Sequence, residues 1–182
     1  MEAINKTELL SQLENYIERH LQEAIQTFQN LSEEILLQPS SSGGWSIAQC
    51  LDHLNSYGVY YLPLFEKGIA EHQDSSVPTF TSSLLGNLAI RSMNPATGKK
   101  KFKAQKGHIP PQALDAPKVV SEFINQQERL LLIVRKAQHK DLGKIKIPIS
   151  IAKFLKLNLG DALHFLIIHN ERHIQQANRN LK

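Results

Sequence analysis

Cysteine is nearly absent from this sequence, and other features that would narrow its function are missing as well. Cys50 is the only cysteine among 182 residues, which excludes an intrachain disulfide and a zinc site built from several cysteines. No apolar run is long enough to span a bilayer. The first residues lack the basic start and apolar stretch of a signal peptide. We therefore expect a cytoplasmic protein that does not enter a membrane.

Charge of one sign is also scarce, since the net charge is only +4. Much of the basic excess falls in a lysine-rich tract over residues 99–106. This tract contains only Phe102 as an aromatic residue and matches no nucleic-acid-binding motif. We interpret it as a solvated loop and expect no nucleic-acid partner. With 41% hydrophobic and 21% charged residues, the composition is typical of a globular protein, and we expect one domain over residues 1–182.

Apolar residues recur at helical spacing in four segments, and no alternation typical of strands is sustained. Helices are expected over residues 5–37, 46–72, 116–139 and 159–180. Four long helices favour an all-α fold, a four-helix bundle with one long crossover connection.

Capping residues support three of these helix starts. Ser46 and Gln49 form a capping box, and Asp115 can cap the third long helix. Asn158 and Asp161 occupy cap-like positions at the start of the last helix.

Two connections separate the later helices. The crossover, residues 73–114, is rich in proline, glycine and serine and has enough apolar content for one short helix at residues 82–93. Residues 140–157 form a second connection, with a turn of helix expected near residues 151–155.

The most informative motif is a pair of histidines, His169 and His173, one helical turn apart on the last helix. This spacing points two imidazoles at one spot, as in many metal-binding helices. Leu166 and Gln176 share their face, and a polar ring on an apolar face needs a partner. His53 lies near the apolar face of the second helix. If the two helices pack together, three imidazoles converge.

Each of these histidines also has a simpler interpretation. A single histidine such as His53 is more often a core residue bonded to a backbone carbonyl. With eight histidines in the chain, one pair at i, i+4 spacing, such as His169 and His173, can arise by chance. Cys50, one turn before His53, could offer a thiolate, but single buried cysteines usually behave as small hydrophobes. We therefore leave Cys50 out of the site. The remaining histidines are expected in polar stretches, in loops or on another helix face: His20, His72, His108, His139 and His164.

No residue stands out as a general base, so the catalytic residues stay unknown. Asp52 and Glu171 adjoin the histidines in sequence, but both are expected to point away from them. Gln176 could orient a metal ligand by hydrogen bonding. Tyr57 and Tyr61 could line a pocket, although core packing is the simpler role for each.

The same residues carry a family resemblance. Residues 45–54, WSIAQCLDHL, resemble the second-helix motif of the DinB/YfiT-like metalloenzymes of the DinB superfamily. Residues 169–176, HNERHIQQ, resemble their last-helix H-x-x-x-H motif, and residues 159–161 resemble the entry to that helix. The resemblance implies that His53, His169 and His173 bind a divalent ion such as nickel or zinc. It also implies a homodimer and, from characterised members, thiol-dependent transfer or isomerisation.

Three neutral imidazoles would leave open positions on the metal, as in catalytic sites. Metal-bound water would give hydrolysis, whereas a thiol bound as thiolate would give thiol transfer. We expect a metal-dependent enzyme that resembles thiol-dependent S-transferases and acts on a small molecule with a low-molecular-weight thiol. The alternatives are a metal-dependent hydrolase and a non-catalytic helical dimerisation module. The crossover is expected either to shape the mouth of the pocket, with its lysines binding an anionic partner, or only to cover one side of the bundle.

Overall fold

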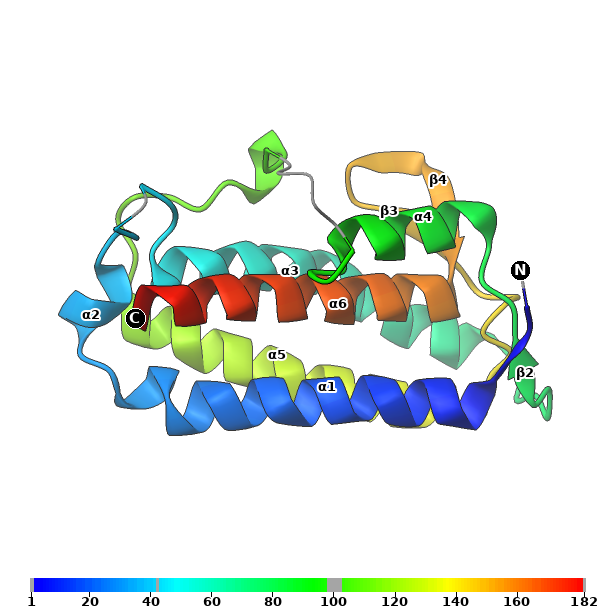
Figure 1. The fold of residues 1–182 in the computed structure, drawn as a ribbon. Coiled ribbons are helices and arrows are strands. Elements are labelled where there is room, and N and C mark those ends of the chain that lie inside the picture. The colour runs from blue at the N-terminus through cyan, green and yellow to red at the C-terminus, as the bar shows by residue number, and fades with distance from the viewer. Residues whose placement is uncertain (1, 42, 98–102, 182) are drawn as a thin grey trace.

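Four long helices form the body of the protein in the computed structural model, which describes residues 2–41, 43–97 and 103–181 (Figure 1). α3 and α1 each pack against both α5 and α6, so the four helices close into a bundle around a shared apolar core. None of the described helices has the length and apolar character needed to cross a membrane. The four helices are α1 (Lys6–Gln26), α3 (Ile47–Glu71), α5 (Ala116–Ala137) and α6 (Leu159–Asn178).

The predicted helix starts of α3 and α5 are confirmed. The hydroxyl of Ser46 accepts a hydrogen bond from Gln49 N, and the Gln49 side chain accepts one from Ser46 N. The Asp115 side chain accepts a hydrogen bond from Lys118 N. These bonds satisfy amide groups that a helix start otherwise leaves without partners.

The prediction of one helix over residues 5–37 is wrong. α1 ends at Gln26, a 3₁₀ turn follows (Phe28–Asn30), and a separate short helix, α2 (Glu33–Leu37), comes next. The Asn30 side chain donates to the carbonyl groups of Ile25 and Gln26, which ends α1. Ser32 then caps α2 through a bond from Ile35 N. Polar side chains that bond the local backbone therefore override the apolar periodicity.

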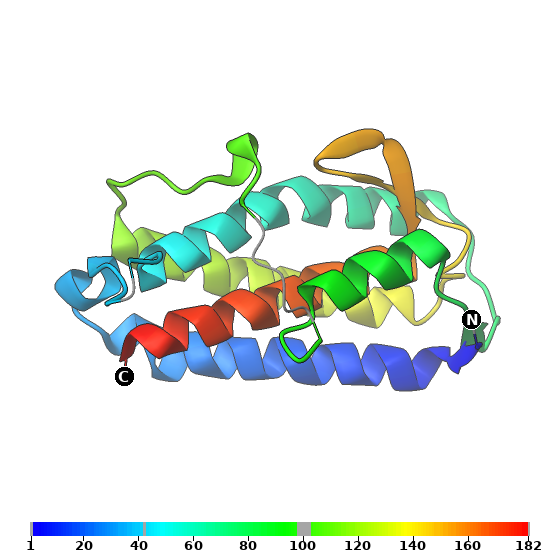
Figure 2. The ribbon, with the colours of Figure 1, turned by 45° about the horizontal axis from the view of Figure 1, so that its top comes forward.

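The crossover between α3 and α5 holds the predicted short helix, α4 (Leu84–Met93), which lies along α6 (Figure 2). Before α4, strand β2 (Thr79–Phe80) pairs antiparallel with β1 (Ile4–Asn5) near the start of α1. After α4, a 3₁₀ turn, η2 (Lys106–His108), lies against α3.

The expected turn of helix near residues 151–155 is also wrong. This segment belongs to an antiparallel hairpin of β3 (Lys146–Ile149) and β4 (Ala152–Asn158). Ile145, Ile147 and Leu157 are buried in the core beneath it. Lysine and isoleucine alternate over residues 144–147, and this short alternation is the strand signal that the sequence analysis missed.

The residues expected to cap α6 have other partners. Asn158 forms no side-chain cap, and its Oδ1 accepts a hydrogen bond from Lys146 Nζ in the hairpin. Asp161 is fully buried. Its carboxylate accepts hydrogen bonds from Ser82 Oγ (2.5 Å), Ser83 N (3.0 Å) and Ser83 Oγ (2.7 Å). Asp161 therefore fastens the start of α4 to α6.

This contact predicts a large loss of stability for Asp161→Ala. The substitution leaves three donors of Ser82 and Ser83 without their acceptor in a buried place, and we expect a loss of about 2–4 kcal/mol in the free energy of unfolding. Urea unfolding of the two proteins measures the difference. The exposed Asp74→Ala is the control and should change stability little. A loss in Asp161→Ala no larger than in this control would contradict the assignment.

Candidate metal centre

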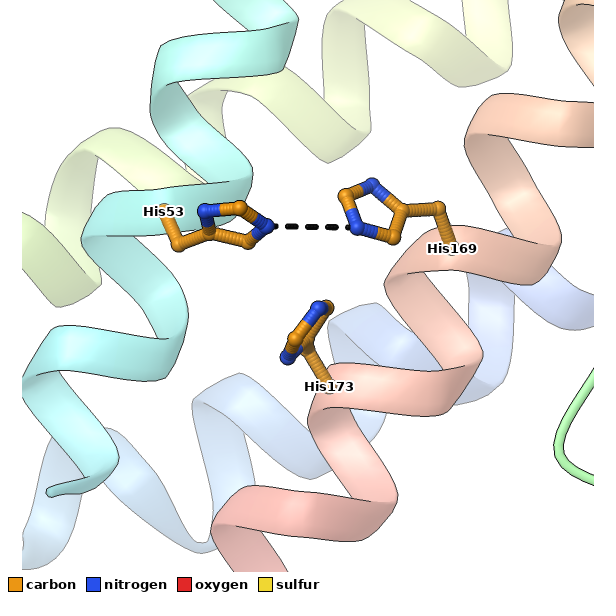
Figure 3. A group of neighbouring side chains, drawn as sticks. All are labelled: His53, His169 and His173. Atoms are coloured by element: carbon orange, nitrogen blue, oxygen red, sulfur yellow. Dashed lines mark hydrogen bonds between the residues drawn. The ribbon is translucent and has the colours of Figure 1, made fainter. Parts of the chain in front are cut away.

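Three histidine side chains from two helices meet between α3 and α6 (Figure 3). His53 comes from α3, and His169 and His173 come from successive turns of α6. One ring nitrogen of each lies within 4.8 Å of the others. His53 Nε2 is 3.2 Å from His169 Nε2. The convergence predicted from the sequence is therefore present in the structure.

The spacing of the nitrogens suits a shared ion. Two nitrogens that each lie about 2.1 Å from one ion, at a roughly tetrahedral angle, are about 3.4 Å apart. The separation of 3.2 Å between the Nε2 atoms of His53 and His169 is close to this value. The group contains imidazoles alone, without a carboxylate. Such a donor set fits a zinc or nickel ion better than calcium or magnesium.

Burial keeps these imidazoles neutral. It lowers the pKa of His53 to about 4 and that of His173 to about 3, from the usual 6.5. The pKa of His169 is also well below 6.5, because the ring is buried and because His173 and His53 lie beside it. The positive charge of Arg172 acts in the same direction on His169 and His173. At neutral pH the rings therefore offer lone pairs, which a metal ion needs.

Hydrogen bonds fix two of the three rings. His53 Nδ1 donates to the backbone carbonyl of His108 at 2.6 Å, and His173 Nδ1 donates to Gln176 Oε1 at 3.0 Å. Both bonds leave Nε2 unprotonated, as in most metal-bound histidines with an outer hydrogen-bond partner. The predicted role of Gln176 thus corresponds to a contact in the structure. His169 differs, because its buried Nδ1 has no hydrogen-bond partner among the described residues.

His108 is the residue that the sequence analysis missed. It was expected in a polar loop, yet η2 brings its ring against α3, stacked on Tyr57 with 3.9 Å between the ring centroids. His108 Nδ1 is also 2.8 Å from Ser56 Oγ. His108 follows His53 by 55 residues and lies in a segment without helical or strand periodicity. No local pattern in the sequence indicates this contact.

Aromatic rings surround the three histidines. Trp45 lies 4.8 Å from the His53 ring and 5.7 Å from the His173 ring. Tyr57 lies 4.6 Å from His169, and Phe165 stacks on the same ring at 5.9 Å, all measured between centroids. Burial raises the pKa of Tyr57 to about 12, so its hydroxyl stays protonated. These rings shield the imidazoles from bulk water.

Tyr61, the other tyrosine considered from the sequence, packs in the core rather than against the three histidines. It lies one turn beyond Tyr57 on α3, and its hydroxyl accepts a hydrogen bond from Ser150 N in the hairpin turn. The ring packs against Phe65 and Phe165 in the core. It therefore joins the hairpin to the bundle.

The other residues considered from the sequence lie outside the three-histidine group. Burial raises the pKa of Cys50 to about 12, so it stays a thiol. Glu171 faces α1, where His20 Nε2 donates to its carboxylate at 2.9 Å, and this bond lowers the pKa of Glu171. Asp52 likewise does not belong to the group. The four residues Lys99, Lys100, Lys101 and Phe102 lie outside the described part of the chain, so anion recognition by the crossover stays a prediction.

The comparisons with known proteins agree with this architecture. A family model described as the DinB superfamily matches residues 16–177. The chain belongs to the DinB superfamily. Among solved structures it resembles YfiT from Bacillus subtilis, with a TM-score of 0.55 and 15% identity over 96% of this chain and 85% of that one. That protein is described as a probable metal-dependent hydrolase with an unusual four-helix bundle topology. No curated protein matches this chain.

The lowered pKa values of the histidines predict how the folding stability of this DinB superfamily protein, without metal, depends on pH. His53 and His173 titrate near 6.5 when unfolded but near 4 and 3 when folded. Between these values the unfolded chain binds more protons, so stability should fall as pH drops from about 6.5 to about 4. Urea unfolding of metal-free protein across this range measures the effect. A variant with both histidines replaced by glutamine should show a weaker dependence, and an equally steep one would contradict the assignment.

Bound metal should also survive to lower pH than ordinary histidines allow. An imidazole of usual pKa releases metal below about pH 6.5. In the folded protein, protons compete with the ion for His53 only near its pKa of about 4. Metal content measured after equilibration at stepwise lower pH should therefore stay constant down to about pH 5. Release centred near pH 6.5 would show that the rings are not shielded as described.

Proposed function

We propose that the chain is a metal-dependent hydrolase of small molecules, in which His53, His169 and His173 hold one divalent zinc or nickel ion. The observation that carries the proposal is the convergence on one point of three neutral imidazoles, of which those of His53 and His169 are buried. The description of YfiT as a probable metal-dependent hydrolase supports the choice of reaction.

Three protein ligands leave coordination positions for water and substrate, as in other catalytic metal sites. When bound, the ion supplies a Lewis acid and lowers the pKa of a water to about 7. The hydrogen bonds from His53 to the His108 carbonyl and from His173 to Gln176 orient the two rings. Trp45 packs on both of these rings, and Tyr57 packs on the His53 ring. The positive charge of Arg172 beside His169 and His173 favours an anionic ligand over a cationic one.

Transfer to a low-molecular-weight thiol is the second candidate. The three-histidine group contains no carboxylate that could act as a base. A thiolate bound to a metal is already deprotonated and needs no such base. The charge of Arg172, which favours hydroxide, favours a thiolate equally. In this second candidate function, a low-molecular-weight thiol is the co-substrate. The homodimer expected from the sequence stays a prediction.

Replacing any one of the three histidines by alanine should remove most of the bound metal. Protein purified without a metal-affinity tag is analysed for zinc and nickel, and the wild type should hold one ion per chain. The control is His139→Ala, which changes a histidine exposed at the end of α5. Stoichiometric metal in His169→Ala, or a loss in His139→Ala as large as in the other variants, would contradict the ligand assignment.

The reaction class can be tested on the metal-loaded protein with a panel of small esters, amides and electrophilic thiol acceptors. A hydrolase should turn over an ester or amide in thiol-free buffer. A chelator should abolish this activity, and the restored ion should recover it. Turnover that needs an added thiol would favour transfer. A metal-loaded protein inactive in both assays would favour the non-catalytic helical module.

A further inference from the structure

The partner of His53 Nδ1 comes from a distant part of the chain. The His108 carbonyl that accepts this bond lies 55 residues further on, in the crossover between α3 and α5. A carbonyl oxygen can only accept, so the bond holds the proton on Nδ1 and leaves the Nε2 lone pair facing His169. The protonation state and ring orientation of one candidate ligand therefore depend on where the crossover lies.

The side chain of His108 is held by the same turn of α3. Ser56 Oγ donates to the His53 carbonyl at 2.6 Å and lies 2.8 Å from His108 Nδ1. A hydroxyl has a single hydrogen, so the second bond must be donated by His108 Nδ1–H. Three bonds then form a closed circuit. His53 donates to the His108 backbone, the His108 ring donates to Ser56, and Ser56 donates to the His53 backbone.

The His108 ring also packs against α3. The His108 ring stacks on Tyr57, whose own ring contacts His169. The neighbours of His108 in η2, Lys106 and Gly107, are exposed. Within this 3₁₀ turn, contact with α3 is thus concentrated in His108.

We propose that His108 is a positioning residue, through which the docked crossover sets the metal affinity of the His53 site. The inference rests on the proposed function, because it assumes that His53 is a ligand. Loss of an outer hydrogen-bond partner typically weakens metal binding by about 10–100-fold. Linkage is reciprocal, so metal bound to His53 in turn stabilises the docked position of residues 103–110.

The test compares zinc affinity among variants by competition with a chromophoric chelator. His108→Ala keeps the backbone carbonyl but removes the ring that places it, and Ser56→Ala removes the hydroxyl that holds the ring. We expect each to bind zinc about 10-fold more weakly. The double variant should lose no more than either single one, because both substitutions open the same circuit.

Two further variants separate positioning from a general loss of structure. His108→Asn places an amide N–H near the position of Nδ1, so it should recover most of the affinity lost in His108→Ala. Lys106→Ala changes an exposed residue of the same turn and should bind zinc as the wild type does. Thermal unfolding without metal should be similar in all of these proteins.

Hydrogen exchange of the amides in residues 103–110 gives a readout independent of activity. Zinc should slow exchange there in the wild type and have little effect in His108→Ala. If the wild type binds one zinc and both alanine variants match its affinity, the positioning role is refuted while the proposed function stands. If the wild type itself binds neither zinc nor nickel, the proposed function is refuted and this inference with it.

Discussion

Removal of water from the space between α3 and α6 governs the chemistry of this protein. Three imidazoles in water would be partly protonated near pH 6.5 and would repel one another once charged. Here residues His53 and His169 are only 3% and 4% exposed, and burial lowers their pKa values. Neutral rings can lie with two nitrogens 3.2 Å apart and share a proton between them. The predicted loss of stability of metal-free protein in acid and the predicted retention of bound metal below about pH 6.5 both follow from this desolvation.

The bundle holds α6 at the rotation that this arrangement needs. His169 and His173 face α3, while Glu171, two residues from each, faces α1 and accepts a hydrogen bond from buried His20. Asp161, two turns earlier, fastens α6 to the start of α4. Contacts on three sides of one helix therefore fix the direction of the histidine pair. The crossover likewise contacts both α6, through α4, and His53, through the carbonyl of His108.

The parts of the fold that depend on local pattern could be predicted from the sequence. Helical periodicity predicted the four long helices, and the i, i+4 spacing predicted that His169 and His173 share a face. Two of the failures share a cause, which is that a local pattern does not reveal a distant partner. Asp161 looked like a cap because it lies in a first helical turn, but its partners are serines 78 and 79 residues earlier. His108 likewise looked like a loop residue, because its contacts with α3 exist only after the crossover folds back.

The central claim is that His53, His169 and His173 hold one ion together. A crystal structure of metal-loaded protein, with anomalous data collected on both sides of the absorption edge of the bound metal, tests it most directly. We predict one strong anomalous peak per chain between α3 and α6, about 2.1 Å from the Nε2 atom of each histidine. A peak bound by only two of these residues, or one located elsewhere with the three rings in place, would contradict it.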